Sequence, residues 1–242
     1  MISSAGSSPF YLTPPAQPAL PIAGEAQLFA VRRIWCVGRN YAAHAREMGS
    51  DPTREAPFFF AKPADALVSS PLSAAHVAYP PQTKNFHHEV ELVVAIGTAG
   101  RNISVDQALG HVIGYAVGID LTRRDLQNAA KDRGQPWAMG KGFDASAPCS
   151  ALQLAANIGH PSQGAIELRL NGQSRQFGHL QDMIWSVAET IAHLSKLVGL
   201  APGDLIFTGT PEGVGPLQIG DLIDARIEGV GTLSCTIDPP TA

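Results

Sequence analysis

The sequence predicts a β-rich α+β fold in which many strands are accompanied by a few short helices. Twenty-four glycines and 19 prolines among 242 residues indicate frequent turns. Short runs of β-branched and aromatic residues, which favour strands, lie between these turns. One longer segment, 182–198, repeats apolar residues at the spacing of a single helix face. The hydrophobic fraction of 45% is sufficient for a substantial core.

The length and composition are consistent with one catalytic domain over residues 25–242, preceded by an arm over residues 1–24. The arm is rich in Ser, Pro and Ala, so we interpret it as a flexible or pairing extension. A net charge of −4 without a basic block argues against nucleic acid as a partner. No apolar run reaches the roughly 20 residues that a membrane span requires. We also expect no secretory signal, because no Lys or Arg precedes Arg32 and a compact apolar segment is lacking.

The three cysteines are far apart and match no metal-binding pattern. Their odd number also argues against a disulfide framework. The sequence is therefore expected to belong to a reducing, cytoplasmic compartment.

The first predicted strand covers 32–38 and ends at Gly38, after which 42–48 has the composition of a short helix. His44 and Glu47 are three residues apart, so they share one face of this helix. Such a pair is commonly a surface hydrogen bond. It gains a catalytic meaning if the helix covers a site, where a carboxylate-oriented imidazole can accept a proton from water. We interpret residues 40–57, with their linker-like second half, as a mobile lid.

A second strand is predicted at 58–63, where three consecutive phenylalanines precede Lys62. This lysine either extends to the surface or directs its charge at an anionic substrate. Residues 71–85 are rich in proline and are expected to form a loop that crosses to the next strand.

Two carboxylates lie in the strand predicted at 86–97. Glu89 and Glu91 share one face of it because successive side chains alternate. The strand predicted at 112–120 ends in Asp120, and neighbouring positions in one sheet would bring the three carboxylates together. Oxygen ligands of this kind suit Mg²⁺, Mn²⁺ or Ca²⁺ rather than Zn²⁺. The alternative is an acidic pair on a solvated sheet edge.

Several further elements follow Asp120. A short helical turn is expected over 121–127 with Thr122 as its N-cap. Lys141 lies between two glycines in a predicted loop, so its backbone can approach a ligand closely. Asn171-Gly172 predicts a type I′ hairpin turn.

The C-terminal part contains a glycine-rich segment, 208–216, directly after a strand at 205–207. It lacks the Gly-Lys-Ser/Thr signature of a phosphate-binding loop. The chain is expected to close with an antiparallel hairpin over 221–227 and 231–237.

Seven short motifs occur in an order that resembles the fumarylacetoacetate hydrolase family, and the resemblance covers residue 32 to the C-terminus. The motifs are Gly38-Arg39-Asn40-Tyr41, His44-x-x-Glu47-Met48, Phe60-x-Lys62-Pro63, Glu89-Val90-Glu91-Leu92, Asp120-Leu121-Thr122-x-Arg124-Asp125-x-Gln127, Lys141-Gly142-Phe143-Asp144 and Pro202-Gly203-Asp204…Thr208-Gly209-Thr210-Pro211-x-Gly213-Val214-Gly215. The resemblance implies a mixed β-sandwich roll and a homodimer. It also implies one Mg²⁺ or Mn²⁺ held by Glu89, Glu91 and Asp120.

Within the family, the segments 32–49, 57–66 and 183–191 are most similar to enzymes of gentisate breakdown that cleave fumarylpyruvate. The implied reaction adds water to the distal ketone of an acylpyruvate and releases fumarate and a pyruvate enolate. We expect His44, oriented by Glu47, to be the general base. Lys141 and Gln127 are expected to stabilise the oxyanion. The remaining substrate contacts are assigned to Arg39, Asn40, Lys62, Arg124 and Thr210, with Lys131 or Arg133 for the distal carboxylate.

Other activities remain open at this point. Oxaloacetate decarboxylation and isomerisation of a 2-hydroxy-dienedioate would need the same enolate chemistry, but the His44–Glu47 pair favours hydrolysis. A metal-stabilised binding protein without catalysis is a further alternative. A serine hydrolase is not indicated, because the chain has no Gly-x-Ser-x-Gly motif.

Overall fold

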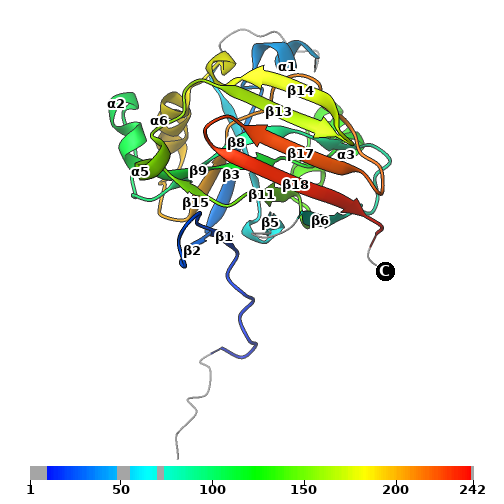
Figure 1. The fold of residues 1–242 in the computed structure, drawn as a ribbon, viewed down its shortest axis with the longest axis horizontal. Coiled ribbons are helices and arrows are strands. Elements are labelled where there is room, and N and C mark those ends of the chain that lie inside the picture. The colour runs from blue at the N-terminus through cyan, green and yellow to red at the C-terminus, as the bar shows by residue number, and fades with distance from the viewer. Residues whose placement is uncertain (1–9, 48–54, 70–73, 241–242) are drawn as a thin grey trace, which may run out of the picture.

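The computed structural model describes residues 10–47, 55–69 and 74–240. Two large sheets pack against each other, and short helices lie around them (Figure 1). This is the β-rich α+β fold that the sequence predicted. The first nine residues of the predicted arm and residues 48–54 of the predicted lid lie outside the described part.

The larger sheet has eight strands and mixed direction, in the order β4-β3-β15-β8-β9-β11-β5, with β12 paired to β9. β3 and β15 run parallel, whereas β8 is antiparallel to both β15 and β9. The strands are β3 (Arg33–Gly38), β4 (Phe58–Lys62), β5 (Leu67–Ser69), β8 (Val90–Ile96), β9 (Val112–Ile119), β11 (Ala147–Cys149), β12 (Gln153–Leu154) and β15 (Asp204–Phe207).

The second sheet has five strands in the order β14-β13-β17-β18-β6 and faces the viewer in Figure 1. Asn171 and Gly172, both with positive φ (52° and 79°), form the turn between β13 and β14, which confirms the predicted hairpin. β17 and β18 form the predicted closing hairpin. The strands are β6 (Ala75–Ala78), β13 (Ala165–Leu170), β14 (Gln173–His179), β17 (Leu222–Ile227) and β18 (Gly231–Asp238).

Strand β8 is buried on both faces, which explains its continuous apolar sequence. Leu92 and Val94 belong to the core between the two sheets. Val93 and Ala95 point to the opposite face and pack in a second cluster with β3 and β15. Glu91 has the same strand parity as Val93, so its carboxylate lies on the face opposite the five-stranded sheet.

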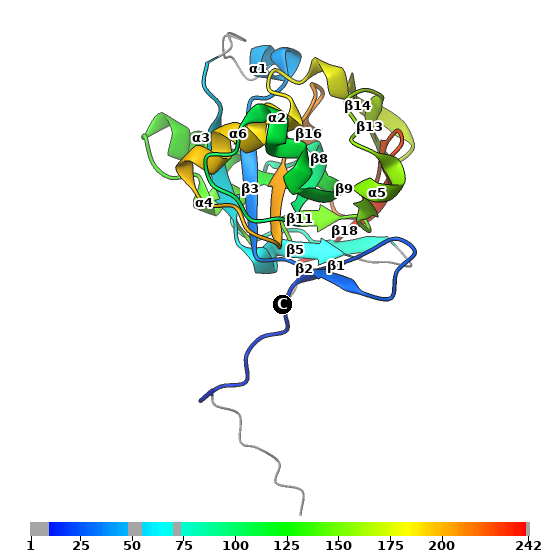
Figure 2. The ribbon, with the colours of Figure 1, turned by 90° about the vertical axis from the view of Figure 1, so that its left-hand side faces the viewer.

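The N-terminal hairpin of β1 (Ala19–Pro21) and β2 (Leu28–Ala30) lies at one end of the body, and residues 10–18 extend away from it (Figure 2). A small three-stranded sheet joins β7 (Phe86–His88), β10 (Thr122–Arg123) and β16 (Gly215–Pro216). The helices are α1 (Ala42–Glu47), α2 (Val105–Ala108), α3 (Arg124–Asp132), α4 (Ala138–Lys141), α5 (Ala155–Ile158) and α6 (Val187–Leu197). None of the helices in the described ranges is long and apolar enough to cross a membrane.

Several local predictions were wrong. The strand predicted at 86–97 is broken at Glu89, because β7 and β8 pair in different sheets. Thr122 is not an N-cap but lies in β10, where its hydroxyl donates to the carbonyl of Asp120. Lys141 is in a short helix rather than a loop, and the predicted crossing loop contains β6.

The long C-terminal helix begins at Val187, five residues later than predicted. Ser186 and Glu189 form a capping box that fixes this start, since each side chain bonds the other residue's backbone N–H.

Candidate active site

Three carboxylates meet beside the centre of the larger sheet. Glu89 lies at the junction of β7 and β8, Glu91 in β8, and Asp120 directly after β9. The backbone N–H of Asp120 donates to the carbonyl of Glu89 (2.8 Å). One oxygen from each of the three carboxylates lies within 4.8 Å of the others, and all three residues are buried. This burial rules out the solvated sheet edge. The set of hard oxygen donors fits a divalent cation such as Mg²⁺ or Mn²⁺.

Three cationic side chains surround two of these carboxylates. The Nζ of Lys141 lies 2.7 Å from Glu89 Oε2 and 2.6 Å from Asp120 Oδ2. The Nζ of Lys62 is 2.8 Å from the other oxygen of Asp120, and Arg124 forms an ion pair with Glu89. The side chains of all five residues are buried, so each charge is stabilised chiefly by these partners.

Among the residues that the structure describes, no lysine or arginine forms an ion pair with Glu91. Its Oε2 accepts a hydrogen bond from the backbone N–H of Gly209 (2.7 Å), at the start of the glycine-rich loop. Burial raises the pKa of Glu91 well above its usual value, and the negative charges of Asp120 and Glu89 raise it further.

The pKa of Glu89 shifts in the opposite direction. Burial alone would raise it, but Lys141 and Arg124 outweigh that effect and hold the pKa well below its usual range. For Lys141, burial lowers the pKa, and the stronger attraction of Asp120 and Glu89 leaves it raised. Glu89 and Lys141 are therefore both charged at neutral pH.

The His44–Glu47 pair on α1 faces the carboxylate cluster. Nδ1 of His44 lies 3.2 Å from Oε2 of Glu47, and Glu47 also accepts from the backbone N–H of Gly213 (3.1 Å). His44 is 6% exposed and lines the same pocket as the carboxylates. Since Nδ1 is turned toward Glu47, Nε2 is the nitrogen that can act in the pocket. The helix thus covers a site, which is the condition under which a catalytic role was predicted for this pair.

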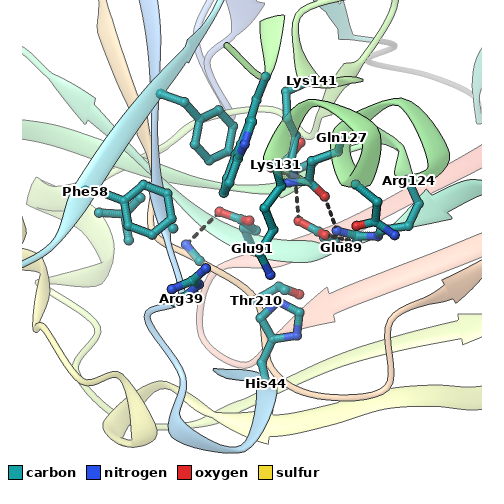
Figure 3. A pocket seen from close by; sticks show the side chains of 17 residues that line it. Arg39, His44, Phe58, Glu89, Glu91, Arg124, Gln127, Lys131, Lys141 and Thr210 are labelled. Atoms are coloured by element: carbon teal, nitrogen blue, oxygen red, sulfur yellow. Dashed lines mark hydrogen bonds and ion pairs between the residues drawn. The ribbon is translucent and has the colours of Figure 1, made fainter. Parts of the chain in front are cut away.

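The pocket above the carboxylates combines basic and aromatic side chains (Figure 3). Arg39 has a left-handed backbone (φ 59°), and its guanidinium lies 5.4 Å from the ring centroid of Phe58. Phe58 packs edge-on against Trp137, with 5.4 Å between the ring centroids. The residues predicted from the sequence that line this pocket are Arg39, His44, Glu89, Glu91, Asp120, Arg124, Gln127, Lys131, Lys141 and Thr210.

Gln127 is oriented by Arg124, whose Nη1 donates to the Gln127 Oε1 (2.5 Å). The Nε2 group of Gln127 is therefore the part of this amide that can donate to a ligand in the pocket.

Three predicted substrate contacts lie elsewhere. Asn40 is fully buried, and its amide bonds the backbone of Trp185 and the carbonyl of Thr208, so it joins two loops. Lys62 lies behind Asp120, where it also donates to the carbonyls of Leu121 (3.1 Å) and Lys141. Arg133 is exposed at the end of α3 and does not line the pocket.

Three residues at or beside the site were not predicted from the sequence. Phe58 was assigned only to a buried strand, and Trp137 was passed over although it immediately precedes the Lys141 segment. Gln176 is fully buried within β14, between two exposed neighbours. No local pattern marks a glutamine on such a strand, since its burial depends on what the sheet packs against.

Comparison with known proteins decides the family. Residues 33–238 match the family model described as fumarylacetoacetate (FAA) hydrolase, C-terminal. The chain belongs to the fumarylacetoacetate hydrolase family. The similarity thus extends over the whole of both large sheets.

Relatives with named activities include fumarylpyruvate hydrolases and an oxaloacetate tautomerase. A fumarylpyruvate hydrolase from Ralstonia sp. is 47% identical over 189 residues, which cover 78% of this chain and 96% of the relative. A crystal structure of fumarylpyruvate hydrolase from Pseudomonas aeruginosa in complex with Mn²⁺ and pyruvate is 52% identical, with a TM-score of 0.93. That match covers 95% of this chain and 99% of the other. The human mitochondrial oxaloacetate tautomerase FAHD1 is 40% identical over 209 residues, or 86% of this chain and 93% of the relative.

Proposed function

We propose that this family member hydrolyses the carbon–carbon bond of an acylpyruvate, with fumarylpyruvate as the substrate and fumarate and pyruvate as the products. The observation that carries the proposal is the position of the His44–Glu47 pair, which faces the buried carboxylates across one pocket. A site that only rearranged an enol would not need an activated water. Similarity to two fumarylpyruvate hydrolases supports the substrate.

Glu89, Glu91 and Asp120 would hold a Mg²⁺ or Mn²⁺ ion, as their oxygen donors and burial permit. When bound, the ion supplies Lewis-acid stabilisation of the charge that develops on the pyruvyl end. Lys141 and Lys62 fix both oxygens of Asp120, and Arg124 fixes Glu89, so the carboxylates are oriented in advance.

In the proposed reaction, Nε2 of His44 accepts a proton from water, and the resulting hydroxide adds to the distal ketone. Glu47 stabilises the imidazolium that forms. Nε2 of Gln127 donates to the oxyanion, whereas Lys141 is already bonded to two carboxylates and Thr122 Oγ1 and contributes positive charge. The carbon–carbon bond then breaks, its electron pair passes to the pyruvate enolate, and His44 returns the proton to the enolate carbon.

The charged pocket residues that remain fit a dicarboxylate. Arg39 and Lys131 both line the pocket and have no acidic partner among the residues that the structure describes. We assign the distal carboxylate to them, with Arg39 stacked over Phe58. Arg133, the alternative considered from the sequence, is not needed.

The first experiment follows the loss of the ultraviolet absorbance of fumarylpyruvate, with pyruvate and fumarate quantified, in the presence and absence of Mg²⁺ or Mn²⁺. Acetylpyruvate and oxaloacetate are run in parallel. The proposal requires metal-dependent release of both products, with fumarylpyruvate the best substrate. His44→Ala should lower kcat by ~10²–10⁴-fold and leave Mn²⁺ affinity unchanged. His76→Ala, at an exposed histidine, is the matched control.

A second candidate is the interconversion of the enol and keto forms of oxaloacetate, because a relative at 40% identity bears that name. It requires a proton shuttle but no water addition. Faster tautomerisation of oxaloacetate than hydrolysis of fumarylpyruvate would favour this activity. Oxaloacetate decarboxylation is tested by product analysis of the oxaloacetate reaction. Dienedioate isomerisation is tested by an added assay with a 2-hydroxy-dienedioate as the substrate.

We also propose that the protein forms the homodimer implied by the family resemblance. Light scattering coupled to gel filtration would test it directly.

A further inference from the structure

Gln176 connects the two parts of the chain that form the site. Its side-chain oxygen Oε1 accepts a hydrogen bond from the backbone N–H of Val90 (3.1 Å), the residue between Glu89 and Glu91. Its Nε2 donates to Oγ1 of Thr210 (2.8 Å) and to the carbonyl of Pro211 (2.9 Å), both in the glycine-rich loop. Gln176 is fully buried, so these bonds are shielded from water.

The orientation of this amide is fixed by its backbone partners. The Val90 N–H can only donate, and the Pro211 carbonyl can only accept. Oε1 must therefore face Val90, and Nε2 must face the loop. His88, whose Nδ1 lies 2.9 Å from Oε1, is consistent with the same orientation if Nδ1 carries the proton.

The orientation of this amide determines the hydrogen-bonding role of the Thr210 hydroxyl. Because its Oγ1 accepts from Gln176, the hydroxyl proton is available to donate in another direction. In the described part of the chain, the bond from Gln176 is the hydrogen bond that this hydroxyl makes. Thr210 lines the same pocket as His44 and the carboxylates (Figure 3).

We propose that Gln176 is a positioning residue that makes the Thr210 hydroxyl a dedicated hydrogen-bond donor to an anionic oxygen of the ligand. The same side chain keeps the loop aligned with the strand segment that bears Glu89 and Glu91. This role rests on the metal site of the proposed function but not on which acylpyruvate is cleaved.

The packing of the loop on β14 leaves little freedom for a different arrangement. Gly213 has a φ of +91°, and a Cβ there would lie 2.0 Å from the carbonyl oxygen of Arg175. A Cβ on Gly178 would lie 2.8 Å from the Pro211 ring. The loop thus packs closely on β14 on both sides of Gln176, through its backbone at Gly213 and through the Pro211 ring at Gly178. The Gln176 amide adds hydrogen bonds between the two segments.

A double-mutant cycle tests the proposal. The variants are Gln176→Leu, Thr210→Val and the double variant, and the readout is the Kd of oxalate for the Mn²⁺-loaded protein, measured by calorimetry. Each single substitution should weaken oxalate about tenfold, the size expected for a hydrogen bond to a charged group. The double variant should also lose only about tenfold, because Gln176 acts through Thr210. The Mn²⁺ affinity of each variant should stay within threefold of the wild-type value, because the pairing of Val90 with Ile119 of β9 does not involve either substituted side chain.

If the double variant bound oxalate about a hundredfold more weakly than the wild type, the two substitutions would act independently, and the proposal would be overturned. An unchanged oxalate affinity in Gln176→Leu would also overturn it. Gln173→Leu, on an exposed position of the same strand, is the matched control. If Gln176→Leu does not fold, Gln176→Met, which is uncharged and close to glutamine in length, replaces it in the cycle with the same criteria. Oxalate binding does not depend on turnover. If the effects of the two substitutions on oxalate affinity are not additive but the protein does not hydrolyse fumarylpyruvate, the proposed function is rejected and the role of Gln176 stands.

Discussion

Lys62→Met should destabilise the metal-free protein strongly and the metal-loaded protein much less. Lys62 is a fully buried lysine whose Nζ lies 2.8 Å from Asp120 Oδ1. Methionine fills a similar volume but leaves one oxygen of a buried carboxylate without its cation. Removing one partner of a buried ion pair costs ~3–5 kcal/mol. For a chain of this size the melting temperature should fall by roughly 6–20 °C.

A bound divalent cation changes this expectation. Without the Lys62 charge, the carboxylate cluster is more negative and should attract the ion more strongly. Ligand at 100 times its Kd stabilises a protein by about 2.7 kcal/mol, and a tighter Kd increases this value at the same concentration. The difference in melting temperature between the variant and the wild type should therefore become smaller as Mn²⁺ is added.

The assay is thermal unfolding followed by circular dichroism, with chelator and with a series of Mn²⁺ concentrations, alongside calorimetric Mn²⁺ affinity. Lys196→Met, at an exposed position of α6, controls for the loss of a lysine. Equal destabilisation with and without metal, together with an unchanged Mn²⁺ affinity, would refute the electrostatic coupling of Lys62 to the site.

Three further predictions concern other regions. Gly213→Ala should lower kcat/KM at least tenfold, because the added Cβ would lie 2.0 Å from the Arg175 carbonyl oxygen and displace the loop that bonds Glu47. The control in the same kinetic assay is Gly172→Ala, whose Cβ would have no atom within 4 Å. Ser186→Ala should cost about 1 kcal/mol in urea unfolding through loss of the α6 capping box, and an unchanged midpoint would contradict this. Native protein should not react with Ellman's reagent at pH 8, whereas protein unfolded in guanidinium should show three reactive thiols. All three cysteines are buried. Burial also raises the pKa of Cys235 to about 12, so little of its reactive thiolate is present at pH 8. Rapid labelling of the native protein would show that a thiol is accessible.

The carboxylate cluster could be predicted because it depends on short-range geometry. Alternation along one strand sets the relation of Glu89 to Glu91, and a second apolar strand ends at Asp120. The structure adds the register, in which Glu91 pairs with Gly118. The family motifs then identified the cations, although not which carboxylate each one contacts.

Residues whose role depends on packing between distant segments could not be predicted. Gln176 is separated by 34 residues from Thr210 and by 86 from Val90, and nothing local distinguishes it from the exposed Gln173 on the same strand. Asn40 was predicted to contact the substrate, but its amide joins two loops by bonding the backbone of Trp185 and Thr208. Thr122 failed as a cap because strand pairing with His87 competes with local capping.

The parallel pairing of β3 with β15 has a consequence for how the protein is made. Residues 33–36 acquire this neighbour only when residues 204–207 arrive, and β6 acquires β18 only near the end of the chain. Non-local pairing of this kind slows folding. Gly209, which bonds Glu91, is also part of this late segment. During synthesis, Glu89, Glu91 and Asp120 are therefore all present long before the pocket around them can form. A metal ion can be captured by the finished site only after most of the chain has been made.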